Sequence, residues 1–122
     1  FESSAETFTA HTANGFCKIA LNDVDYLEAQ NKWVLVYLSD GKVQKLREQF
    51  SKCEGIFTPE KGFFKCHRSY IVNLSRIRQF TRTQITTAFS SSVPISRNSY
   101  AAFKDAYFAF MFNSGTNFTT LD

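Results

Sequence analysis

The chain has 122 residues, of which 43% are hydrophobic, and a formal net charge of +3. This length suits one domain, and the hydrophobic content argues against a disordered chain. No apolar run approaches the roughly 18 residues that a membrane-spanning helix needs, and no signal-peptide pattern opens the chain. Because the first residue is Phe1 and not Met, we expect a fragment or a processed product. Three widely spaced cysteines (Cys17, Cys53 and Cys66) indicate free thiols in a cytoplasmic protein, since a disulfide scaffold uses an even number.

The first half of the chain predicts short antiparallel strands. Asn14-Gly15 is a strong hairpin signal between two alternating segments, and Ser39-Asp40-Gly41 is a second hairpin turn. Around residues 47–53 the pattern becomes helical, with Leu46, Phe50 and Cys53 at positions i, i+4 and i+7. The strands expected in this half cover residues 6–11, 16–21, 24–29, 33–38 and 42–46.

The second half predicts further short strands and a closing helix. Pro94 marks an edge strand, because proline cannot donate to a central ladder. Ser96 is a natural N-cap for the helix that follows. Residues 113–122 are polar, and we expect them to form a flexible tail. The strands expected here cover 70–74, 76–80, 82–89 and 93–95, and the apolar face of the helix comprises Tyr100, Phe103, Tyr107 and Phe110. The expected fold is therefore mainly β, with one short internal helix and a C-terminal helix.

Charge is distributed unevenly along the chain. The first 60 residues carry six basic and nine acidic side chains, whereas residues 61–104 carry eight basic and no acidic ones. A block of one sign is costly to concentrate unless an anion receives it, and a nucleic-acid backbone is the strongest candidate. Five of the eight cations are arginine, which suits bidentate contact with phosphate and guanine. The eight are Lys61, Lys65, Arg68, Arg76, Arg78, Arg82, Arg97 and Lys104.

The sequence does not assemble a catalytic or metal site. Cys66 and His67 are adjacent, but neighbours on an extended chain point to opposite faces, which makes them a poor nucleophile–base pair. Neither a zinc-ligand spacing nor a glycine-rich phosphate loop is present in the sequence. We therefore expect a protein that is not an enzyme, with no metal, no cofactor and no small-molecule substrate.

Several segments together resemble the LytTR-type DNA-binding domain, the output domain of LytR/AgrA-like bacterial response regulators. The stretch His67-Arg68-Ser69-Tyr70-Ile71-Val72-Asn73 is highly specific to that family, and the order and spacing of the flanking motifs agree. The resemblance covers roughly residues 6–107, so we expect one domain over 1–122 with its core in that range. The matching segments are Asp25 to Ala29, Val34 to Tyr37, Asp40-Gly41, Phe63 to Leu74, Ile77 and Val93 to Arg97.

The resemblance implies an elongated module of small stacked antiparallel sheets that reads double-stranded DNA with loops rather than with a recognition helix. It also implies insertion into successive major grooves, bending of the duplex, two protomers on a repeated site, and attachment to an N-terminal receiver or sensor domain of a two-component system. By analogy, the side chains facing DNA are Asn31, Lys32, Lys65, Arg68, Ser69, Arg97 and Asn98.

Two other functions remain open at this point. The segment 107–112 is more aromatic than a capping helix requires, which would suit a protein-interaction or dimerisation module; Phe108 and Phe112 lie on a stripe beside the core face. Aromatic side chains near basic ones would also suit single-stranded nucleic acid, on which bases stack.

Overall fold

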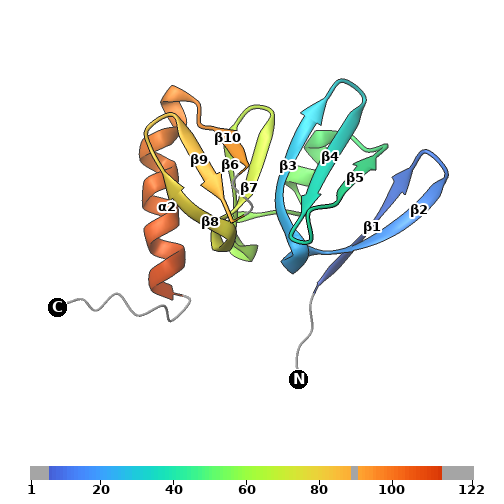
Figure 1. Cartoon of the computed structure of the whole chain (residues 1–122), viewed down its shortest axis with the longest axis horizontal. Coiled ribbons are helices and arrows are strands. Elements are labelled where there is room, and N and C mark those ends of the chain that lie inside the picture. Colours follow the sequence, from blue (N-terminus) through green and yellow to red (C-terminus); the bar gives the residue numbers. More distant parts are fainter. Residues whose placement is uncertain (1–5, 89–90, 114–122) are drawn as a thin grey trace.

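The computed structural model describes residues 6–88 and 91–113. It is an elongated, mainly β molecule, with a β-hairpin at one end and a helix at the other (Figure 1). The mainly β fold, the short internal helix and the C-terminal helix predicted from the sequence are therefore confirmed. The strands are β1 (Thr7–Thr12), β2 (Gly15–Ala20), β3 (Val24–Gln30), β4 (Trp33–Leu38), β5 (Val43–Leu46), β6 (Phe63–His67), β7 (Tyr70–Asn73), β8 (Ile77–Phe80), β9 (Gln84–Thr87) and β10 (Ser92–Pro94). The helices are α1 (Phe50–Glu54) and α2 (Tyr100–Asn113), with short 3-10 turns η1 (Leu21–Asp23), η2 (Pro59–Lys61), η3 (Leu74–Arg76) and η4 (Arg97–Ser99).

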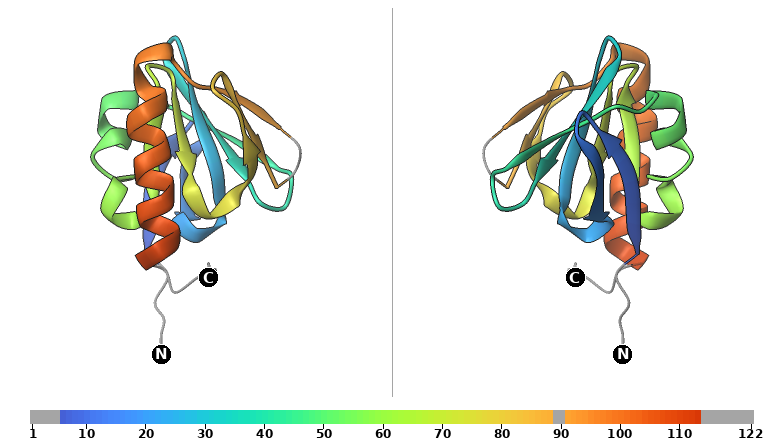
Figure 2. Two further views of the ribbon diagram at one scale, coloured as in Figure 1. Left: turned by 90° about the vertical axis from the view of Figure 1, so that its left-hand side faces the viewer. Right: turned by 90° about the vertical axis from the view of Figure 1, so that its right-hand side faces the viewer.

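The strands form three antiparallel sheets. The central sheet has five strands in the order β5-β4-β3-β7-β6, so β7 joins β3 after the chain has passed through α1 and β6. A three-stranded sheet, β10-β9-β8, lies towards α2, and the β1-β2 hairpin lies at the far end (Figure 1). Figure 2 shows α1 and η2 on one side of the strand layers.

The central sheet is covered on both faces, and this explains why consecutive residues of β3 and β7 are buried. One face packs against the hairpin and α1 in a hairpin-side core, and the other packs against β8–β10 and α2 in a helix-side core. Because successive side chains of a strand point to opposite faces, sequence neighbours enter different cores. Leu27, Ile71 and Phe63 enter the hairpin-side core, and Tyr26, Val72 and Phe64 enter the helix-side core.

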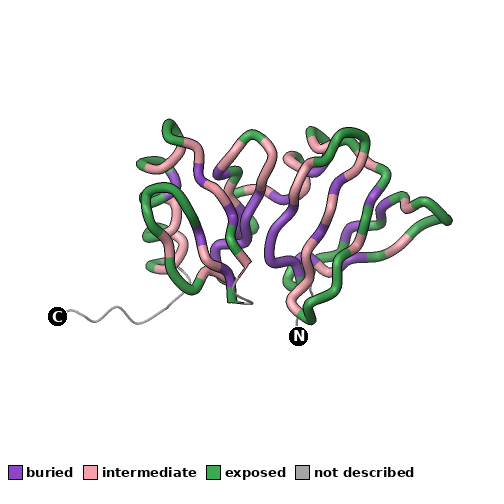
Figure 3. The backbone as a smooth tube through the Cα atoms, turned by 45° about the horizontal axis from the view of Figure 1, so that its top comes forward, coloured by how far each residue is buried: buried purple, intermediate pink, exposed green. Residues whose placement is uncertain are grey.

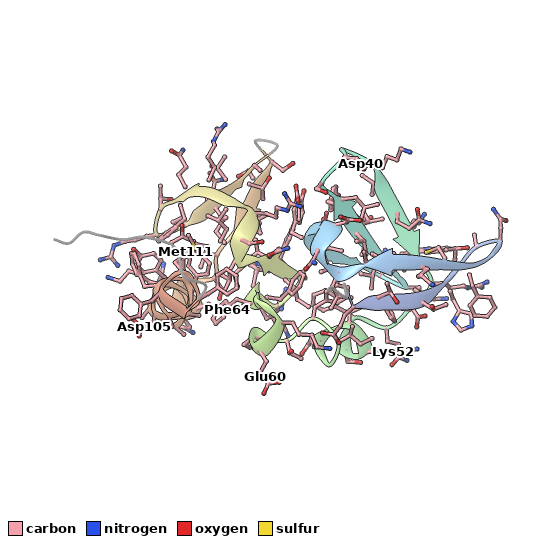
Figure 4. The ribbon with its side chains drawn as sticks, turned by 90° about the horizontal axis from the view of Figure 1, so that it is seen from below. Asp40, Lys52, Glu60, Phe64, Asp105 and Met111 are labelled. Atoms are coloured by element: carbon pink, nitrogen blue, oxygen red, sulfur yellow. The ribbon has the colours of Figure 1, made fainter. Side chains whose placement is uncertain are left out.

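Helix α2 closes the helix-side core with aromatic rings. Phe103 is fully buried, which is worth roughly 1.5–3 kcal/mol for a side chain of this size. Its ring centroid lies 5.0 Å from that of Phe80 and 5.8 Å from that of Phe64, both in edge-on geometry. Figure 4 shows Phe64 between β6 and α2. Tyr107 and Phe110 pack on the same core, as the predicted helical face requires.

The two helices begin later than the sequence pattern indicates. Helix α1 begins at Phe50, not Arg47, because Arg47 continues the β layer and donates its N–H to the carbonyl of His11 at 2.8 Å. Helix α2 begins at Tyr100, because η4 precedes it. The Ser96 hydroxyl donates to Ser99 Oγ at 2.6 Å and does not cap the helix backbone. Of the predicted tail, residues 114–122 lie outside the described residues.

Candidate nucleic-acid interface

Four connections of the fold lie at the same end of the molecule, at the top of Figure 1. They are the β3–β4 turn, the β6–β7 turn, the β8–β9 turn and η4, and we call this end the turn edge (Figure 1). Its residues are largely exposed, whereas the strands that carry it are buried (Figure 3). The sequence prediction placed contacts in three of these connections, and the structure brings those three together.

Main-chain hydrogen bonds tie the connections of the turn edge to one another. The Ala29 N–H, at the end of β3, donates to the Ser69 carbonyl at 2.8 Å. The Ser96 N–H, which precedes η4, donates to the Cys66 carbonyl at 2.9 Å. The Ile95 N–H donates to the Thr83 carbonyl in the β8–β9 turn, also at 2.9 Å. The exposed side chains therefore stand on a connected backbone frame rather than on independent loops.

The β3–β4 turn presents Asn31 and Lys32. Gln30 pairs with Trp33, so the connection has two residues, and Asn31 takes the left-handed conformation with φ +52°. Asparagine tolerates this conformation better than most residues, which is why the sequence allows so tight a turn here. Both side chains are exposed.

The β6–β7 turn presents Arg68 and Ser69. His67 pairs with Tyr70, and the Ser69 N–H donates to His67 Nδ1 at 3.1 Å. The imidazole also meets the Tyr70 ring edge-on, with centroids 5.5 Å apart. His67 thus holds the turn, while Arg68 points into solvent as an exposed cation.

The third predicted loop is η4, which presents Arg97 and Asn98 at the start of the C-terminal helix. Both side chains are exposed. The Ser99 N–H donates to the Ser96 carbonyl at 2.9 Å, which holds η4 as a single tight turn. Arg97 is placed beside the β8–β9 turn, where it shares a surface hollow with Arg82.

Lys65 is placed differently from the other predicted contacts. It lies within β6, and its ammonium group is 2.9 Å from the Glu54 carboxylate and 5.9 Å from the centre of the Phe50 ring. Its side chain is therefore directed to α1, and its charge already has a partner.

The eight basic residues of 61–104 do not all lie on one surface. Besides Lys65, Lys61 pairs with Glu6 at 3.0 Å, and Arg76 Nε lies 3.6 Å from Asp25 Oδ1. Burial raises the pKa of Asp25, against the opposing effect of Arg76. These cations offset acidic residues of the first 60, which the charge count could not show. The exposed cations in the turns of the turn edge are Lys32, Arg68, Arg82 and Arg97.

The other end of the molecule carries exposed acidic side chains in three separate segments. Asp23 in η1, Asp40 in the β4–β5 turn and Glu60 in η2 are exposed there. Figure 4 looks at this end from below and shows Asp40 and Glu60 on opposite sides of the strands. Exposed Lys42 and Lys61 lie in the same β4–β5 turn and the same η2, so this end carries both signs of charge. The four connections of the turn edge contain exposed cations and no carboxylate, which makes that end the one suited to a polyanion.

A tyrosine cluster braces the strands below the turns. The Tyr37 hydroxyl donates to Glu28 Oε1 at 2.9 Å, and the Tyr26 and Tyr37 rings stack with centroids 4.2 Å apart. Burial, and then the nearby Glu28 carboxylate, raise the pKa of Tyr70 to about 12 and also raise the pKa of Tyr37. These phenols are neutral at physiological pH, so they brace β3, β4 and β7 as hydrogen-bond donors.

Cys66 and His67 have structural roles and do not form a nucleophile–base pair. Cys66 is fully buried, and its thiol donates to the Pro94 carbonyl at 3.4 Å. Burial raises the pKa of Cys66 to about 12, so the nucleophilic thiolate does not form at neutral pH. All three cysteines are free thiols. The described residues contain no group of three His, Cys, Asp or Glu side chains placed to hold a metal ion.

The sequence prediction omitted two sets of basic residues beside the turn edge. Arg82, in the β8–β9 turn, was counted in the basic block but not assigned a contact. Lys45 and Arg47, on and after β5, stack over Trp33 at 4.4 and 6.0 Å from the ring centre. The sequence could have indicated Arg82, because it is a basic residue at the junction of two predicted strands. It could not have indicated Lys45 and Arg47, because their position over Trp33 depends on how β5 pairs with β4.

Arranged in this way, the fold and its exposed basic turns define a nucleic-acid-binding module. The family model of the LytTr DNA-binding domain matches residues 14–107. The chain belongs to the LytTr DNA-binding domain family. This membership does not favour the protein-interaction module considered above.

Individual proteins resemble the chain over much of its length. It is 36% identical over 93 residues to the transcriptional regulatory protein YpdB of Escherichia coli O6:H1, and 32% identical over 90 residues to YpdB of strain K12. Each match covers 69% of this chain and 36% of the relative, so the matched region spans about a third of those proteins. A LytTr DNA-binding domain from a Bacillus cereus response regulator has the same fold, with a TM-score of 0.69 at 23% identity, covering 85% of this chain and 97% of that one. The described residues contain no helix long and apolar enough to span a membrane.

Proposed function

We propose that this chain is a single domain that binds double-stranded DNA sequence-specifically, as the output domain of a bacterial transcriptional regulator. Its family supplies the class of partner. The observation that carries the finer proposal is the turn edge, where exposed Lys32, Arg68 and Arg97 stand in separate connections of one backbone frame. Separate rigid turns suit insertion into successive major grooves, in which each base pair shows a distinct pattern of donors and acceptors.

The side chains divide by the contact that each can make. Arg68 and Arg97 read base edges, because a planar guanidinium can bond guanine O6 and N7 together. Lys32, Ser69, Asn31 and Asn98 contact phosphate or sugar and set the register. Lys65 joins them by exchanging the Glu54 carboxylate for a phosphate as its partner.

The proposed arrangement of protomers on DNA is inferred from the family. Two protomers occupy a repeated site in the cytoplasm, and a receiver or sensor domain of the whole protein controls them. Turns that enter adjacent grooves require a curved duplex, whose bending costs of the order of 1–6 kcal/mol and depends on sequence. Bending therefore adds selectivity at base pairs that no side chain touches.

Selection of bound duplexes from a random pool tests the central claim. A shared sequence with a fixed half-site spacing is the expected result. If the selected duplexes share no sequence, the domain binds DNA non-specifically and the proposed sequence specificity is wrong. Preference for single strands in direct competition would contradict the duplex assignment.

Arg97→Ala then tests base readout. Removing a bidentate guanine bond pair costs about 1–3 kcal/mol of discrimination, so affinity for the selected duplex should fall by about 5- to 150-fold, with a much smaller reduction on random duplex. Fluorescence anisotropy at one fixed salt concentration measures both. Equal reductions on the two duplexes would make Arg97 a backbone contact.

The salt dependence of binding separates Lys32 from Lys65. Each lysine that neutralises a phosphate adds about 0.9 to the slope of log K against log salt, because it releases condensed counterions. Lys32→Gln should lower the slope by about that amount. Lys65→Gln should lower it less, because Glu54 competes with the phosphate for the Lys65 ammonium and keeps part of its charge neutralised in the free protein. An unchanged slope for Lys32→Gln would remove the β3–β4 turn from the interface.

A further inference from the structure

The β8–β9 turn adds a fourth connection to the turn edge, and it carries an arginine that has no part in the contacts proposed so far. Arg82 is exposed in the turn, and its guanidinium lies 5.2 Å from the centre of the Tyr100 ring. A guanidinium over an aromatic face is held by the ring quadrupole while its outer N–H groups stay free to donate. Tyr100 itself is fixed, because it packs on the helix-side core beside Phe80.

Arg82 and Arg97 face a common hollow. Its volume is about 470 Å³, and the residues that line it are Arg82, Thr83, Ile95, Arg97 and Tyr100. Two cations come from segments that are distant in sequence, and the bond from the Ile95 N–H to the Thr83 carbonyl fixes one segment to the other. Within the described residues, neither arginine has an acidic partner, and no carboxylate lines the hollow.

A second hollow, at the other end of the turn edge, shows why the lack of a carboxylate in the Arg82–Arg97 hollow matters. It is lined by Asn31, Lys32, Arg47, Glu48 and Gln49, so it contains a carboxylate. The Glu48 side chain is only 6% exposed, and this desolvation would raise its pKa, but hydrogen bonds from His11 and Lys52 outweigh it and lower the pKa. That hollow therefore holds its own anion, whereas the Arg82–Arg97 hollow lacks one.

We propose that the Arg82–Arg97 hollow binds a phosphate group of the DNA backbone, with Arg82 as the residue that holds it. This rests on the DNA-binding function proposed above and extends the footprint beyond the predicted contacts to the β8–β9 turn. Arg97, at the hollow's edge, reaches the groove beside the bound phosphate. The phosphate at Arg82 fixes the position of the duplex, and therefore the base that Arg97 meets.

The test compares Arg82→Gln with Arg78→Gln, which removes the same charge from an exposed position within β8, four residues earlier. Anisotropy titrations over a series of salt concentrations are run with selected and with random duplex. Arg82→Gln should lower affinity equally on both duplexes and reduce the salt slope by about 0.9, and Arg78→Gln should leave the slope nearly unchanged. Arg82→Lys, which keeps the charge, should restore the slope.

A second measurement uses inorganic phosphate and the Nε–H signals of the arginines in NMR spectra. Phosphate should shift the signals of Arg82 and Arg97 and leave that of Arg78 in place. If neither arginine responds and the slope of Arg82→Gln matches wild type, the hollow is not a phosphate site, while wild-type DNA binding keeps the proposed function. A reduction confined to the selected duplex would make Arg82 a base contact and overturn the proposal. Failure of the wild type to bind any duplex would overturn both.

Discussion

Gly62 joins η2 to β6 at a place where the backbone and helix α2 leave no room for a side chain. Its φ is +92°, and a Cβ built there would lie 2.8 Å from Phe110 Cε1 and 3.3 Å from Phe110 Cζ. Gly41, in the β4–β5 turn, has φ +89° but would meet nothing within 4 Å. The two glycines therefore share the backbone constraint and differ in the contact with α2.

The two alanine variants should differ by the cost of that contact. The left-handed conformation costs a non-glycine residue about 1–2 kcal/mol, so Gly41→Ala should be destabilised by about that much. Gly62→Ala should be destabilised by about 1–3 kcal/mol more, since the Phe110 ring must shift within a packed core. At roughly 4 °C per kcal/mol for a domain of this size, the variants should melt several degrees apart. Urea unfolding gives the free energies, with the slope m checked for constancy.

A double-mutant cycle tests the cause. Phe110→Leu removes the ring atoms that a Cβ at position 62 would approach, so the excess cost of Gly62→Ala should vanish in the Gly62→Ala/Phe110→Leu protein. Equal destabilisation by Gly41→Ala and Gly62→Ala, or zero coupling in the cycle, would refute the reasoning. The last turns of α2 would then adjust freely to β6.

Two further predictions concern titration and thiol access. Because the pKa of Glu48 is lower in the folded state, its stabilising effect is present above about pH 4.3 and is lost as pH falls through the folded value. Glu48→Gln should therefore lower the free energy of unfolding at pH 7 and make it fall less steeply below about pH 5. Urea unfolding midpoints of the variant that change with pH in the same way as those of the wild type would contradict this. An aromatic disulfide reagent should modify Cys17 in the native protein, and Cys53 and Cys66 only after unfolding, because burial raises the pKa of each buried thiol to about 12. Rapid native reaction of all three would show that the cores open readily.

The strand plan was predictable because local signals agree with the fold. Asn14-Gly15 and Ser39-Asp40-Gly41 each mark a hairpin without long-range information, and the apolar run 33–38 marks a strand. The helix starts were less predictable. Arg47 fits a helical pattern, but its N–H donates to the carbonyl of His11 in the β1-β2 hairpin, a tertiary contact that local preference cannot show.

The site could be predicted in part. The resemblance pointed to turns, and the structure places those turns together. It could not show that Lys65 faces Glu54 or that Arg76 lies beside buried Asp25, because ion pairs depend on which strands become neighbours. The sequence could not indicate the proposed role of Arg82 for the same reason, because that role depends on the fold that places Tyr100 and Arg97 beside it.

The turn edge is joined through peptide groups and not through the side chains assigned to DNA. Replacing Arg68, Arg97 or Asn98 leaves the bonds Ala29–Ser69, Ser96–Cys66 and Ile95–Thr83 in place. Under the proposed function, DNA specificity can therefore change by exchange of a few exposed residues while the backbone frame of the turn edge is retained. We expect variants randomised at those positions to keep the wild-type melting temperature and to differ in the DNA sequences that they select from a random pool.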